Sequence, residues 1–127
     1  MKDPELDILI AELEGRTDLT IADFDAVHHA LVFLLPDRIA PKAAEPTHIS
    51  TTDGAMIIAD EAYPNWVVHI HGRANDRDGQ WRCHLREHET RDTDSAIGSG
   101  RSPVLAQAIL AAVLRLSMIL FKRPDTA

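Results

Sequence analysis

The chain has 127 residues, of which 45% are hydrophobic and 26% are charged, and its formal net charge is −7. This length suits a single domain over residues 1–127, which can bury enough surface to fold without cross-links. One cysteine, Cys83, excludes an internal disulfide and any zinc site that needs two thiolates. Since the first residues show no export-signal pattern, we expect a cytoplasmic protein.

Two helices are predicted before residue 36. Pro4 stands at a first helical position after a capping aspartate, leucines and isoleucines follow at helical spacing, and Gly15 ends the run. Thr20 begins the second helix and can form a capping box with Asp23. This second helix ends at Pro36. Residues 36–49 are rich in proline and predict a surface connection.

The apolar run at residues 55–59 is either a strand or a helical turn, and its periodicity does not decide. Residues 66–71 are rich in β-branched side chains and predict a strand. Residues 72–79 form a turn sequence, and residues 80–89 alternate as the antiparallel partner strand. The face expected to be buried consists of Trp66, Val68, Ile70, Trp81, Cys83 and Leu85.

The opposite face of this strand pair gathers histidine and arginine. The candidate ligand-binding residues on it are His69, His71, Arg82, His84 and Arg86. Arginine is the natural partner of carboxylate and phosphate groups, so an anion is one candidate ligand. The simpler interpretation is a solvated polar face of a half-buried sheet.

Metal binding is a further interpretation of the same face. If the strands pair symmetrically about the turn, His71 faces Gln80 and His69 faces Arg82. An arginine beside a ligating histidine repels a bound cation, so we assign no metal ligands. With no aromatic side chain on this face for base stacking, we do not expect nucleic-acid binding.

The last third of the chain is predicted to hold a loop and a long helix. Residues 98–102 precede the helix and look like an anion-binding loop at a helix N-terminus, although a simple helix cap is favoured. Residues 104–121 are apolar on most sides. Because Arg115 interrupts them, we expect a core or oligomer-interface helix and no membrane span. A homo-oligomer formed through this helix is therefore predicted.

No complete set of catalytic roles can be filled from this sequence. The serines lack a nucleophile context, and paired carboxylates and dinucleotide fingerprints do not occur. We therefore expect a protein without catalytic residues or cofactor, although a hydrolase-like enzyme stays a minor alternative. The expected fold is α+β, with one or two N-terminal helices, an antiparallel sheet of about three strands and a long C-terminal helix packed on it.

Four segments follow one another in a recognisable order. They are the helix at residues 24–31, the Ser-Thr-Thr-Asp segment at residues 50–53, a strand pair with tryptophan, and a closing helix that begins Ser-Pro-Val-Leu-Ala at residue 102. Together they resemble the phage ABA sandwich domain family of small phage and prophage proteins. The resemblance implies a sheet covered by helices on both faces and a phage or prophage origin. It implies no activity, so the leading hypothesis is a non-enzymatic accessory domain that interacts with a protein partner. The alternative is a small anion- or metal-binding module.

Overall fold

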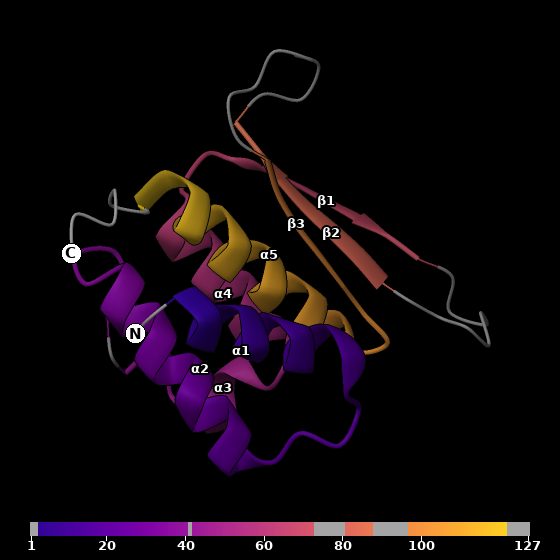
Figure 1. Cartoon of the computed structure of the whole chain (residues 1–127). Helices are drawn as coiled ribbons and strands as arrows, with labels where there is room; N and C mark the ends of the chain where they lie inside the picture. The colour runs from indigo at the N-terminus through magenta and orange to yellow at the C-terminus, as the bar shows by residue number, and fades with distance from the viewer. Residues whose placement is uncertain (1–2, 41, 73–80, 88–96, 122–127) are drawn as a thin grey trace.

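The structure is a computed structural model that describes residues 3–40, 42–72, 81–87 and 97–121. Helices and strands come in separate blocks along the chain (Figure 1). In chain order, the elements are α1 (Asp3–Gly15), α2 (Ile21–Leu34), α3 (Pro46–Ile49), α4 (Thr52–Ala62), β1 (Val67–His71), β2 (Trp81–Arg86), β3 (Ile97–Ser102) and α5 (Leu105–Phe121). The α+β class, the three-stranded antiparallel sheet and the closing helix on the sheet are thus confirmed.

The second helix begins as its capping pattern predicts. The side chain of Thr20 accepts a hydrogen bond from the backbone N–H of Asp23, and the carboxylate of Asp23 accepts one from the backbone N–H of Thr20. These two bonds satisfy backbone donors that would otherwise have no partner at the first turn.

Four helices precede the sheet, where one or two were expected. The apolar run at residues 55–59 belongs to α4, whose start is capped by the side chain of Thr51. Its buried residues recur at helical spacing and continue past the run, which is why residues 55–59 alone did not reveal the period. They are Gly54, Ala55, Ile58, Ala59 and Ala62.

The sheet is antiparallel in the order β1-β2-β3. Its third strand contradicts the prediction for residues 98–102, which form an edge strand and not a loop at a helix N-terminus. The reason for the error is composition, because Gly98, Ser99 and Gly100 have low strand propensity. The pairing of β1 with β2 also differs from the symmetric register by two residues. His69 faces His84, and His71 faces Arg82.

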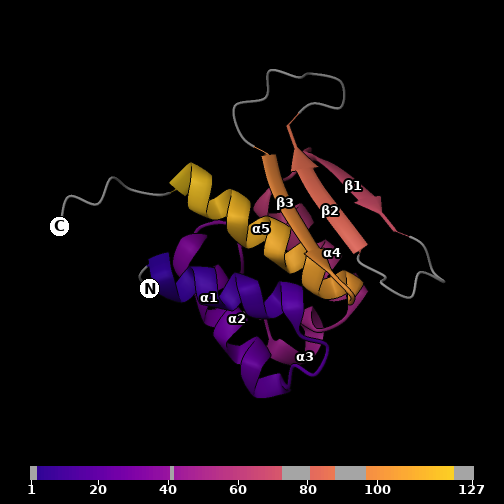
Figure 2. The ribbon, with the colours of Figure 1, turned by 45° about the vertical axis from the view of Figure 1, so that its right-hand side comes forward.

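Glycines in β3 allow α5 to lie directly against the sheet. A Cβ atom at Gly98 would stand 2.5 Å from the Cβ of Leu116, and one at Gly100 would stand 2.2 Å from the backbone oxygen of Ala108. Side chains at these two positions would push the helix away. The helices lie on one side of the sheet, and Figure 2 shows the other side of the sheet facing away from them.

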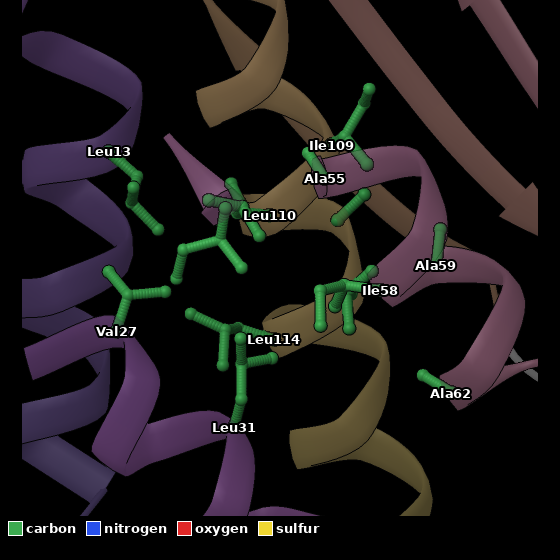
Figure 3. Packing of buried hydrophobic residues seen from close by; sticks show 14 of the residues in the cluster. Leu13, Val27, Leu31, Ala55, Ile58, Ala59, Ala62, Ile109, Leu110 and Leu114 are labelled. Atoms are coloured by element: carbon green, nitrogen blue, oxygen red, sulfur yellow. The ribbon is translucent and has the colours of Figure 1, made fainter. Parts of the chain in front are cut away.

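Helix α5 is the centre of the hydrophobic core. Figure 3 shows Leu13, Val27 and Leu31 of the N-terminal helices pointing toward Leu110 and Leu114 of α5. Residues 106–114 of α5 are all buried within the chain itself. The apolar sequence of this helix is therefore used for internal packing, which leaves Ile119, Leu120 and Phe121 as its exposed large apolar residues. None of the described helices combines the length and apolar character needed to cross a membrane.

Replacing Gly100 by alanine tests the close contact between β3 and α5. We expect Gly100→Ala to lower the free energy of unfolding by about 1–3 kcal/mol, because the added methyl group meets backbone atoms that cannot rotate away. Urea denaturation measures this change. Gly15→Ala is the matched control, since its Cβ atom meets nothing within 4 Å. It should change the free energy by no more than about 1 kcal/mol. Equal losses in both variants would contradict the account.

Candidate anion-binding face of the sheet

The face of the sheet turned away from α5 presents nine side chains in three cross-strand rows. We call this surface the open face. Directly opposite residues on neighbouring strands point to the same side, so the register defines each row. The rows are His71, Arg82 and Arg101; His69, His84 and Ser99; and Val67, Arg86 and Ile97. None of these nine side chains is acidic.

The first row places two arginines directly opposite each other. Arg82 of β2 and Arg101 of β3 are register partners, and His71 of β1 lies on the other side of Arg82. All three side chains are exposed. Like charges directly opposite in a sheet are destabilising, so this row is unfavourable unless a negative group joins it.

Three histidines lie beside the arginine pair. The ring centroids of His69 and His71 are 6.0 Å apart, and those of His71 and His84 are 5.8 Å apart. Nδ1 of His84 is hydrogen-bonded to the hydroxyl of Ser99 at 2.9 Å, and this bond holds the ring over the sheet. Burial lowers the pKa of His84, and so do the charges of His71, His69, Arg82 and Arg86.

The side chain of Glu14 of α1 covers the outer edge of β3. Its carboxylate accepts two hydrogen bonds from the guanidinium of Arg115, at 2.8 and 2.9 Å, and one from the backbone N–H of Arg101 at 3.1 Å. Arg115 also donates to the backbone oxygen of Ser99 at 2.6 Å. Burial raises the pKa of Glu14, but the hydrogen bonds and charge of Arg115 outweigh this effect and leave the pKa below its ordinary value.

A small pocket of about 290 Å³ opens where the arginine pair meets this edge. Arg82, His84, Arg101 and Arg115 line it together with Glu14. The guanidinium of Arg115 donates both side-chain hydrogen bonds to Glu14, and the charge of Arg101 also interacts with this carboxylate. The side chains of Arg82 and Arg101 are exposed to solvent. The volume lies at the small end for ligand pockets and suits a phosphate-sized or carboxylate-sized group.

The structure brings all the predicted ligand-binding residues to one face. They are His69, His71, Arg82, His84 and Arg86. Sequence reasoning placed Ser99 and Arg101 in a separate candidate loop and not on this face, which they join from β3, and it missed Glu14 and Arg115 at the edge of the face. The alternation of Gly98, Gly100 and Ser102 with Ser99 and Arg101 was the available signal, since small residues facing in and polar residues facing out fit a strand under a close helix.

The described residues give less support to a metal site or to a reactive cysteine. No group of three or more His, Cys, Asp or Glu side chains is placed there to hold a metal ion. Cys83 is buried on the helix-facing side of the sheet, and burial raises the pKa of its thiol to about 11, so little reactive thiolate forms at neutral pH.

Comparison with known proteins finds no matching family model, no matching curated protein and no matching solved structure. The resemblance to the phage ABA sandwich domain family therefore stays a prediction. That resemblance implies helices on both faces of the sheet, whereas the described helices lie on one face (Figure 2).

The lowered pKa of His84 predicts a pH dependence of stability. Below about pH 6.5, the ordinary value for histidine, the unfolded chain binds a proton at this residue that the folded chain resists. The free energy of unfolding should therefore fall as the pH drops through this window. His84→Gln should reduce the slope between pH 7 and pH 5, as measured by urea denaturation. An unchanged slope would contradict the assignment. The contribution of Glu14 is lost only below about pH 4.5.

The arginine pair predicts a variant that is more stable than the natural chain. Arg82→Gln removes one of two opposed positive charges, so it should raise the free energy of unfolding by about 0.2–1 kcal/mol. The measurement is urea denaturation at low ionic strength in a buffer free of phosphate and carboxylate. Arg16→Gln is the control, because Arg16 is paired with Asp18 and its loss should not stabilise. A destabilised Arg82→Gln protein would show that the pair is not strained.

Proposed function

We propose that this protein is a non-catalytic binding domain whose open face holds an anionic group, a phosphate or a carboxylate, of its ligand. The observation that carries the proposal is the register pairing of Arg82 with Arg101, next to His71, on a face whose nine described side chains include no acid. Proteins keep such locally unfavourable arrangements mainly at functional sites. An anion between the two guanidinium groups would convert their repulsion into attraction.

The geometry suits an anion for a second reason. Each guanidinium carries several donors in a fixed fork that matches the oxygens of a carboxylate or phosphate. His71 belongs to the same row and His84 to the next one, and they add donors and, when protonated, positive charge. The open face is therefore a local exception in a chain whose net charge is −7.

The role as an interaction domain fits this proposal, since the anion can belong to a protein partner. A phage or prophage origin and a cytoplasmic location remain predictions from the sequence. Homo-oligomerisation also remains a prediction, and only the exposed end of α5 at Ile119, Leu120 and Phe121 is available for it on that helix.

Calorimetric titration with pyrophosphate and with citrate at pH 7 and low salt tests the proposal. We expect one site on the natural chain. Arg82→Gln and Arg101→Gln should each weaken binding about tenfold or more, because each removes charge-assisted hydrogen bonds worth about 1.5–3 kcal/mol.

Two results would contradict the proposal. One is an absence of heat with both anions. The other is equal weakening by Arg16→Gln, which removes a positive charge from the end of α1 and leaves the open face intact. Such a result would mean that binding follows net charge and not this site.

A further inference from the structure

The two edges of the sheet differ in whether other parts of the chain satisfy their backbone hydrogen-bonding groups. At the β3 edge, Glu14 accepts a hydrogen bond from the backbone N–H of Arg101, and Arg115 donates one to the backbone oxygen of Ser99. The C-terminal end of helix α1, which carries Glu14, contacts this edge. Side chains thus satisfy backbone groups of β3 and block the addition of another strand there.

The β1 edge has no such protection among the described residues. Strand β1 pairs with β2, and no backbone hydrogen bond outside the sheet joins residues 67–71 to another described residue. Its sequence is Val-Val-His-Ile-His, which contains no lysine, proline or glycine that would discourage strand pairing. Figure 2 shows β1 at the outer border of the sheet.

We propose that the β1 edge takes up an extended segment of a partner protein as a fourth strand, and that this segment alternates acidic with apolar side chains. This inference rests on the proposed function, because the acidic side chains would lie on the open face. Strand addition of this kind gains affinity from backbone hydrogen bonds and specificity from alternate side chains.

The arginines and histidines of the open face favour acidic side chains at those positions of the partner strand that lie on this face. One set of side chains of an added strand would stand beside His69 and His71, with Arg82 and Arg86 one strand further in. Neighbouring strands lie about 4.8 Å apart, so β2 would be about 10 Å from the added strand, and a long glutamate side chain there can extend across His71 toward the long side chain of Arg82. The described side chains of the open face offer such a strand no acidic neighbour.

The helix side of the sheet favours apolar side chains at the alternate positions of the partner strand. Val68 and Ile70 point to the helix side of the sheet, and Ile70 is 37% exposed although its neighbours Cys83 and Leu85 are fully buried. Apolar side chains from an added strand would cover these two residues. A second copy of β1 fits less well, because antiparallel self-pairing centred on His69 adds histidines and no negative charge.

The test uses peptides and the full chain. The probe is a short peptide in which glutamate and valine alternate. One control has the same composition in two blocks, with all the glutamates before all the valines. A second control carries N-methyl groups on alternate residues, which remove strand hydrogen bonds but keep the charge. Fluorescence anisotropy measures affinity, and hydrogen exchange by NMR measures protection of the amides of residues 67–71.

We expect the alternating peptide to bind at least about tenfold more tightly than both controls and to slow exchange at β1. His71→Glu should weaken this binding about tenfold. Equal binding of all three peptides, with pyrophosphate still bound, would overturn the fourth strand but leave the anion site standing. Failure of pyrophosphate and peptides alike would overturn both. A dimer in light scattering whose β1 amides are already protected without peptide would assign the edge to a second copy and overturn the inference.

Discussion

The contact between the glycines of β3 and the backbone of α5 determines most of this structure. Because Gly98 and Gly100 have no side chains, the helix lies against the sheet at a distance that any Cβ atom would prevent. The helix then buries its own apolar residues between the sheet and the other helices. The sheet is left with one covered face and one face for polar side chains.

The electrostatics of the molecule follow from the same division. Residues 3–35, which form α1, α2 and their connection, carry eight acidic side chains and one basic side chain, whereas the open face collects arginine and histidine. Glu14 joins the two regions, because its carboxylate satisfies both the guanidinium of Arg115 and a backbone N–H of β3. This acid therefore binds the edge of the sheet and its charge also interacts with that of Arg101, whereas none of the nine described side chains of the open face is acidic.

Local signals in the sequence predicted part of this arrangement. The capping box at Thr20 and the alternation in residues 80–89 are short-range patterns, so the second helix and the two faces of the strand pair were predictable. The register was not, since it depends on the length and shape of the turn. The position of strand β3 was missed because its glycines are explained by close contact with α5, a helix that comes later in the chain. Arg101 was missed as part of the site for the same reason.

NMR titration of the arginine side-chain N–H resonances with pyrophosphate addresses the central claim most directly, because it observes the guanidinium groups themselves. If the open face holds an anion, the Nε–H signals of Arg82 and Arg101 shift together and saturate at one equivalent, while those of Arg16 and Arg38 stay in place. Equal shifts at all four arginines, or no shift at Arg82 and Arg101, would contradict the account.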